Sequence, residues 1–326
     1  MTKDTMIAAA KSSRHIFNRT ITIRELLFLS AAAICLSPLV SPPMALLTGL
    51  VFAQFIGHPY MHLNHKATHI LLQVSIVGLG FGINISSALK AGKEGIQFTV
   101  VSIVMTLLVG WMLGRLLKME KKTAFLIASG TAICGGSAIA ALAPVIKAHE
   151  KQISVALGVV FILNSVALLI FPFIGHFMHL SQTQFGLWCA IAIHDTSSVV
   201  GAAAKFGDHA LEVATTVKLA RALWIIPLSL LAAVVYKNKS GKIKVPYFIF
   251  LFILAIVLNS YLSPLKVISP YVVEVSRAGL TLTLFLIGCG LSRKVLKTVG
   301  FTPFFQGVVL WILIAVSALF AVVSLA

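Results

Sequence analysis

The chain has 326 residues, of which 59% are hydrophobic and 11% charged, and its mean hydropathy is +1.00. Soluble domains carry about 25% charged residues, so this composition excludes a water-soluble core enclosed by a polar surface. The formal net charge of +17 would suit nucleic acid, but the basic residues cluster in short segments between apolar runs, which indicates membrane topology instead.

The chain opens with a basic stretch, residues 1–25, that precedes the first apolar run. Its cations are Lys3, Lys11, Arg14, Arg19 and Arg24. A cleaved signal would need a small-residue cleavage site after that run, whereas Ser41-Pro42-Pro43 and another apolar run follow. We therefore expect a cytoplasmic basic N-terminal arm at 1–25 and a transmembrane transporter domain at 26–326.

Apolar runs recur from there to the last residue, and a bilayer core about 30 Å thick needs about 20 apolar helical residues to cross it. The sequence predicts an all-α polytopic membrane protein with about eleven transmembrane helices. Their expected ranges are 26–41, 43–57, 67–87, 96–117, 123–147, 152–176, 184–205, 210–236, 246–262, 270–292 and 302–326. The first two runs are short, so ten crossings remain an alternative.

Lys and Arg are distributed unequally between the two sides of these spans. A cytoplasmic N-terminus places 17 of them inside and six outside, with three within spans. Cytoplasmic loops carry such an excess, so we expect the N-terminus inside and the C-terminus outside.

The four cysteines lie in apolar stretches, without the spacing of metal ligands or redox pairs: Cys35, Cys134, Cys189 and Cys289. We expect them to be small packing residues rather than a disulfide framework. No metal ligand set and no cofactor motif is predicted.

The first polar interruption of an apolar run is Gly130-Thr131-Ala132-Ile133-Cys134-Gly135-Gly136-Ser137, within the expected span 123–147. Glycine and small polar residues weaken a helix here, and unwound backbone at membrane depth survives only where protein or water satisfies it. The N–H groups of Gly135, Gly136 and Ser137, at the start of a half-helix, would form an anion cradle. The alternative is a small-residue groove for close helix packing.

The second interruption is His194-Asp195-Thr196-Ser197-Ser198, within the expected span 184–205. Ionisable residues inside a membrane are costly and are candidates for function. Asp195 can exchange a proton or hold a cation, His194 can titrate near neutrality, and Ser197 is a candidate substrate ligand. The alternative is structural, with Asp195 paired to a Lys or Arg elsewhere.

The third candidate lies in the expected span 210–236, where Thr215, Lys218 and Arg221 recur every three residues. This spacing aligns all three along one helical face. Snorkelling to the interface is an alternative, but Arg221 is followed by five apolar residues. Two cations within the hydrocarbon need anionic partners. Asp195 can supply one negative charge, and a bound anion the other.

The first two interruptions superpose when the chain is shifted by 60 residues, since Ile133–Ser137 then falls on Ile193–Ser197. Repeats with broken helices at corresponding places mark binding sites in secondary transporters. In the expected topology, however, these two spans would run parallel, whereas inverted repeats need opposed segments. The orientation of the repeats stays open at this point.

These strings, followed by Ala214-Thr215-Thr216-Val217-Lys218-Leu219-Ala220-Arg221, resemble the YeiH-type bacterial inner-membrane family, which is also named for sulfate export. The resemblance covers essentially the whole chain. It implies kinship with the cation:proton antiporter and bile-acid symporter group. It also implies a fold in which a core domain with broken, crossed helices packs against a panel domain. The expected location is the bacterial inner membrane.

We therefore expect a secondary active transporter of a small anion, such as sulfate, sulfite or an organic sulfonate, coupled to a proton or cation. The expected substrate ligands are Gly135, Gly136, Ser137, Ser197, Thr215, Lys218 and Arg221, and the coupling residues Asp195 and His194. The expected partners are the anion and the bilayer, and the sequence is compatible with a homodimer.

The main alternative is a proton- or sodium-coupled cation antiporter that uses Asp195, and a passive channel is another. An enzyme is not expected, because Ser, His and Asp that are adjacent in sequence point in different directions on a helix and form no relay.

Overall fold

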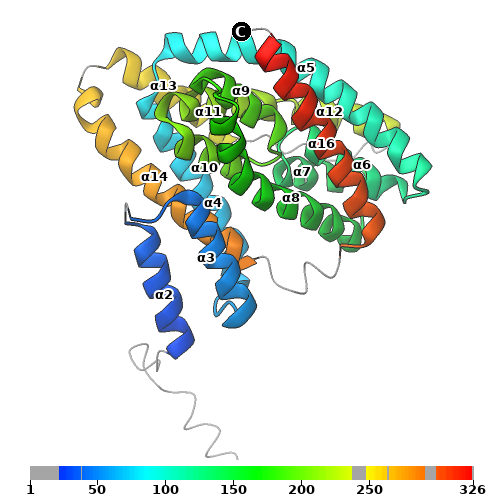
Figure 1. The fold of residues 1–326 in the computed structure, drawn as a ribbon, viewed down its shortest axis with the longest axis horizontal. Coiled ribbons are helices and arrows are strands. Elements are labelled where there is room, and N and C mark those ends of the chain that lie inside the picture. The colour runs from blue at the N-terminus through cyan, green and yellow to red at the C-terminus, as the bar shows by residue number, and fades with distance from the viewer. Residues whose placement is uncertain (1–21, 38, 237–246, 263, 291–298, 325–326) are drawn as a thin grey trace, which may run out of the picture.

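The computed structural model describes residues 22–37, 39–236, 247–262, 264–290 and 299–324, so the expected basic arm falls almost wholly outside them. All regular elements of the described residues are helical (Figure 1). In chain order they are α2 (Ile23–Cys35), α3 (Pro42–Phe55), α4 (Met61–Leu79), the short η1 (Gly80–Gly82), α5 (Ile85–Leu116), α6 (Lys121–Ala132), α7 (Gly136–Val145), α8 (Glu150–Phe177), α9 (Gln182–Ala192), α10 (Thr196–Phe206), α11 (Asp208–Ala222), α12 (Ile225–Val235), α13 (Tyr247–Tyr261), α14 (Leu265–Gly290) and α16 (Phe301–Ser324).

Five segments of the described chain are long and apolar enough to cross a bilayer. They are Phe98–Leu116, Glu150–Phe177, Asp208–Val235, Leu265–Gly290 and Phe301–Ser324. Large apolar side chains are exposed along them, among them Phe173, Val234 and Phe320, as contact with lipid requires. The all-helical membrane class is therefore confirmed, whereas eleven spanning helices are not.

The segment expected to be the fifth span is a hairpin. The Lys122 ammonium, at the start of α6, donates a hydrogen bond of 2.7 Å to the carbonyl of Lys147, just after α7. A straight helix would separate these residues by about 37 Å. The prediction that 123–147 crosses the membrane is therefore wrong. The helix breaks at Ile133–Gly135, as expected, but α7 then returns to the side from which α6 started.

The segment expected to be the seventh span is a second hairpin. The backbone N–H groups of His209 and Ala210, beyond α10, donate to the side-chain oxygen of Gln182 at the start of α9, at 2.9 and 3.2 Å. The prediction that 184–205 crosses is also wrong. Each hairpin arm has 10 to 12 residues, a length of about 15–18 Å, which is half of a bilayer core.

The two hairpins open at opposite ends of α8. Gln152, near the start of α8, donates to Glu120 at the open end of the first hairpin (α6–α7), and α8 ends five residues before the second hairpin (α9–α10). With 28 residues, α8 is about 42 Å long, which is enough to cross the whole bilayer. The sequence left the orientation of the two segments open; in the structure they open at opposite ends of α8, as inverted elements do.

The tips of the hairpins meet. A Cβ on Gly135 would lie 3.1 Å from the His194 carbonyl oxygen and 3.3 Å from the Asp195 Cβ. α11 leaves the open end of the second hairpin and runs beside α9, since a Cβ on Gly186 would lie 2.9 Å from the Ala210 carbonyl oxygen. The polar face of α11 therefore lies at the same depth as the tips of both hairpins.

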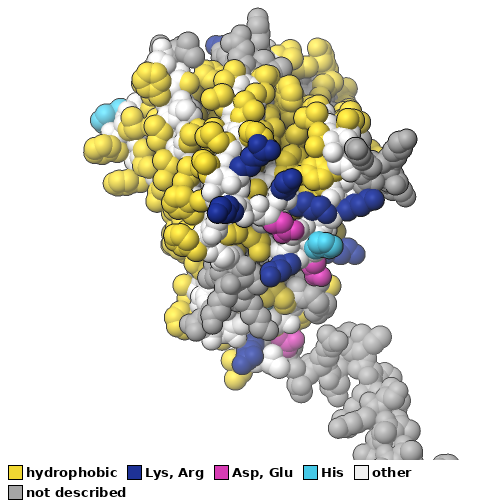
Figure 2. Space-filling view, turned by 90° about the vertical axis from the view of Figure 1, so that its right-hand side faces the viewer, with side chains coloured by type: hydrophobic (Ala, Val, Ile, Leu, Met, Phe, Trp, Pro, Cys, Tyr) yellow, Lys and Arg dark blue, Asp and Glu magenta, His cyan; other side chains and the backbone are white. Residues whose placement is uncertain are grey.

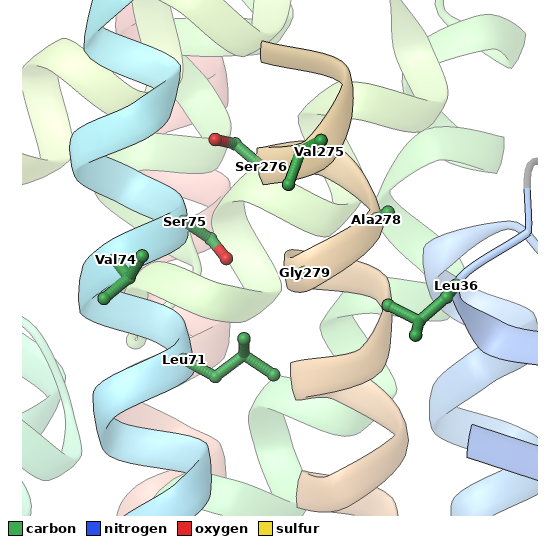
Figure 3. Close-up of a pocket in the computed structure, with 8 residues that line it drawn as sticks. All are labelled: Leu36, Leu71, Val74, Ser75, Val275, Ser276, Ala278 and Gly279. Carbon is green, nitrogen blue, oxygen red and sulfur yellow. The ribbon is translucent and has the colours of Figure 1, made fainter. Parts of the chain in front are cut away.

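A second group of helices, α3, α4 and α14, lies side by side at the lower left of Figure 1. Glycines allow α3 and α14 to pack closely, because a Cβ on Gly49 would lie 2.1 Å from the Phe285 carbonyl oxygen, and one on Gly288 2.3 Å from that of Leu46. Figure 3 shows Ser75 of α4 and Ser276 of α14 at a pocket of about 350 Å³ between these helices.

We predict that cysteines placed at Lys121 and Lys147, both exposed, react with a membrane-impermeant thiol reagent from the same face of oriented vesicles. Cysteines at His179 and Lys205, also exposed, should react from the opposite face. The reason is that each pair flanks a hairpin that returns to its starting side. Labelling of either pair from two different faces would contradict the hairpins and restore the spanning helices.

Candidate functional site at the hairpin tips

Lys218 lies at the tip of the second hairpin and is fully buried. Its ammonium donates to the carbonyl of Ile193 at 2.6 Å and to that of Ala190 at 3.3 Å. These carbonyls are at the carboxyl end of α9, where the aligned peptide dipoles leave a partial negative charge of about −0.5. Lys218 therefore neutralises the end of the arm that enters the membrane.

Arg221, one turn further along α11 and also fully buried, does the same for the first hairpin. Its Nε and Nη2 donate to the carbonyl of Ala132, the last residue of α6, at 2.9 and 2.5 Å. Its Nη1 donates to the Ser102 hydroxyl of α5 at 2.8 Å. One face of α11 thus binds the carboxyl ends of both entering arms, and the spacing of three residues predicted this shared face.

The carboxylate that we expected beside these cations is not in direct contact with them. Within the described residues, no Asp or Glu oxygen lies within 4 Å of Lys218 or Arg221. Asp195 instead caps α10: its Oδ1 accepts from the Ser198 N–H at 2.6 Å and the Ser197 hydroxyl at 2.7 Å, and its Oδ2 accepts from the Ser198 hydroxyl at 3.0 Å. Asp195 therefore forms no direct ion pair with a buried cation, and backbone carbonyls are the direct partners of both cations.

The predicted glycine cradle is formed only in part. Gly135 has φ +61°, a backbone region in which a side chain is strained, and its N–H donates to the Gly130 carbonyl at 2.8 Å. That N–H is therefore not free for an anion. Gly136 begins α7, but the Ser137 side chain is exposed rather than enclosed with the cations.

Asn164 of α8 belongs to this site, although the sequence analysis did not single it out. Its side-chain oxygen accepts the His194 N–H at 2.9 Å, while its Nδ2 is buried and unpartnered. Both ring nitrogens of His194 and the Thr131 hydroxyl are buried without a partner as well. An isolated amide in the apolar run Phe161–Ala167 was a usable signal. Ser102 gave no such signal in the sequence, since single serines are common in membrane helices.

The remaining predicted substrate ligands lie in two different places. Ser197 lies at the tip, bonded to Asp195. Thr215 is fully buried with an unpartnered hydroxyl, but it lines a pocket at the side of α11 that is described below. The four cysteines are buried and free, as expected. No cluster of metal-ligating residues occurs within the described chain.

The tips carry a surplus of positive charge. Lys218 and Arg221 contribute two charges and Asp195 removes one, with His194 counted as neutral. Helix ends do not change this balance, because each tip joins one carboxyl end to one amino end. Lys has three N–H donors and Arg five; the hydrogen bonds above use two and three of them. Three charged donors therefore remain, in addition to the unpartnered amide of Asn164.

Comparison with known proteins identifies relatives over nearly the whole chain. A family described as conserved hypothetical protein 698 matches residues 17–307. A UPF0324 membrane protein of Bacteroides thetaiotaomicron is 50% identical over 324 residues, 96% of this chain and 98% of the relative. One of Porphyromonas gingivalis is 53% identical over 283 residues, 86% of each chain. No solved structure matches the chain.

We predict that Gly135→Ala lowers the free energy of unfolding by roughly 1–3 kcal/mol, because it forces a side chain into a strained region against the second hairpin. Gly136→Ala is the matched control. Its Cβ would meet only side-chain atoms at 3.4 Å or more, and alanine favours a helix by up to about 1 kcal/mol over glycine. Thermal unfolding in detergent measures both variants. Equal stability of the two would contradict the strained tip.

Proposed function

Because the chain belongs to the family described as conserved hypothetical protein 698, whose curated relatives are named as membrane proteins, we propose that it is a secondary active transporter of a small anion. The anion class is an oxyanion of the sulfate, sulfite or organic sulfonate type, and the transport is coupled to a proton. One observation carries the proposal: among the described residues, the hairpin tips hold two fully buried cations and one carboxylate.

The donors at the tips support an oxyanion. Lys218 and Arg221 bind the ends of the two entering arms and Asn164 binds the His194 N–H, so all three side chains belong to the tip region. Unpartnered buried donors are costly, at about 1–3 kcal/mol each. An oxyanion with several acceptor oxygens would satisfy them and compensate the surplus charge, whereas a metal cation would be repelled.

Asp195 supports proton coupling. With Asp195 ionised, the tip region carries one net positive charge, and with Asp195 protonated it carries two. A dianion such as sulfate would therefore bind best together with a proton, and a monoanion without one. This linkage between charge and occupancy follows from Coulomb's law alone. It distinguishes a coupled carrier from a passive channel.

The hairpins also strengthen the charge argument for orientation. Since the first hairpin returns to its starting side, Lys147 and Lys151 move to the side of the N-terminus. The distribution then becomes 19 Lys and Arg inside against four outside, a larger excess than with eleven spans. On the side where α5 and α6 meet, Figure 2 shows Lys and Arg gathered in a band, with Asp, Glu and His side chains among them. We propose that this side faces the cytoplasm of a bacterial inner membrane.

The same geometry disfavours two other functions. Ser197 donates directly to Asp195, and the His194 ring contacts neither as a hydrogen-bond partner, so no nucleophile relay forms and an enzyme is not proposed. A cation antiporter would place its ion at Asp195, beside the two buried cations. It predicts exchange driven by a cation gradient with no anion present.

We predict that the purified protein in liposomes accumulates radiolabelled sulfate, sulfite or an organic sulfonate when a pH gradient is imposed. Arg221→Met should lower anion flux by about a hundredfold or more, since one buried hydrogen bond to a charge contributes about 1.5–3 kcal/mol and the surplus charge is lost as well. Lys205→Met, which removes an exposed cation of α10, is the matched control and should retain flux within about twofold.

Asp195→Asn separates coupling from binding. Asn can still cap α10, so anion exchange across the membrane should persist, while accumulation driven by the pH gradient is lost. Unchanged flux in a folded, monodisperse Arg221→Met protein would remove the anion site. Exchange and accumulation that both survive in Asp195→Asn would remove the proton coupling.

A further inference from the structure

A second polar site lies on α11, away from the hairpin tips. A pocket of about 260 Å³ separates the first half of α11 from the end of α4, η1 and α14. It therefore lies between the helices that carry the hairpins and the second group, at the face where the second hairpin opens. Its lining residues are Leu79, Gly82, Ile83, Asp208, His209, Leu211, Glu212, Thr215, Val273 and Arg277.

The pocket lining holds two carboxylates, of which one pairs with an arginine and the other with a histidine. Arg277 of α14 pairs with Asp208 of α11 at 2.8 Å. Glu212 has His209 Nδ1 at 3.4 Å from its Oε2, and its Oε1 is buried without a hydrogen-bond partner. The lining residues from α4 and η1 are apolar or glycine. Glu212 is thus the site at which this pocket would receive a positive charge.

Thr215 extends the site toward the hairpin tips. It is one turn beyond Glu212 on α11, lines the pocket, is fully buried, and has an unpartnered hydroxyl. Lys218 follows one further turn along, so Glu212, Thr215 and Lys218 share a helical face. The distance along the axis from the first to the last is about 9 Å.

We propose that this pocket is a cation-selective vestibule through which a proton reaches the hairpin tips, with Glu212 as the group that takes it up from water. The proton adds to the Glu212 carboxylate, whose side chain is 21% exposed, and is released to water within the pocket, so no bond other than O–H is made or broken. An anion is repelled by the carboxylate, and anion and proton therefore use different routes. The proton role rests on the proposed function, whereas the selectivity of the vestibule does not.

The vestibule is tested without any transported substrate. Thr215→Cys should react with a cationic, water-soluble methanethiosulfonate at least about tenfold faster than with an anionic one, relative to their rates on a free thiol in solution. Ala214→Cys is the matched control and should be unreactive, because Ala214 is fully buried and does not line the pocket. The four native cysteines are buried, and the parent protein gives their background.

Adding Glu212→Gln should lower the preference for the cationic reagent several-fold, whereas Glu274→Gln, an exposed carboxylate outside the pocket, should leave it unchanged. An unreactive Thr215→Cys, or a preference for the anionic reagent, would overturn the vestibule even if the protein transports anions.

The proton role is tested in liposomes. Glu212→Gln should slow sulfate accumulation driven by a pH gradient by about tenfold or more, while sulfate exchange stays within about twofold of the parent. The proton role would be overturned if Glu212→Gln lowered accumulation and exchange equally, or if it lowered neither. Absence of any anion flux in the parent would instead refute the proposed function, and the labelling result would still decide the vestibule.

Discussion

The contact between two buried cations and the carboxyl ends of two half-helices is the constraint on which this structure depends. Each hairpin must stop at mid-membrane, where terminal carbonyls have no water to bind and each unsatisfied group is costly. Lys218 and Arg221 bind those carbonyls from one helix, α11, and so hold both hairpins at a common depth. Without them, the exposed ends would favour straight helices or a collapsed tip.

This arrangement explains why the polar residues of the chain concentrate at three places. The amino end of α10 is capped by Asp195 and its two serines, the amino end of α7 follows a glycine turn, and the carboxyl ends bind cations. The caps satisfy the backbone but leave the charges unbalanced by one. A protein that needed only stability could have used neutral caps, so the surplus charge and the unpartnered amide of Asn164 favour a site that a solute completes.

The sequence predicted the polar elements of the fold better than its topology. Small and polar residues at 130–137 and 193–198 located both breaks, and the three-residue spacing located the cationic face of α11. The hairpins were not predictable from composition. A run of 25 apolar residues with a central break has the same composition whether the chain crosses the membrane or turns back. What decides the return is a pair of contacts at the open ends, Lys122 to Lys147 and Gln182 to His209, made by residues that look like ordinary loop positions. The hydrogen-bond partners of the two cations were not predictable for a similar reason. They are backbone carbonyls, which every residue has, so the sequence does not distinguish them.

Ligand-dependent stabilisation of the purified protein tests most directly whether the hairpin tips bind an anion. A solute that binds only the folded state raises its stability by about 2.7 kcal/mol at a hundred times its dissociation constant. The midpoint of thermal unfolding should therefore rise with the logarithm of sulfate, sulfite or organic sulfonate concentration, beyond the effect of chloride at equal ionic strength. If all of these anions act no differently from chloride, the surplus charge at the tips does not constitute an anion site.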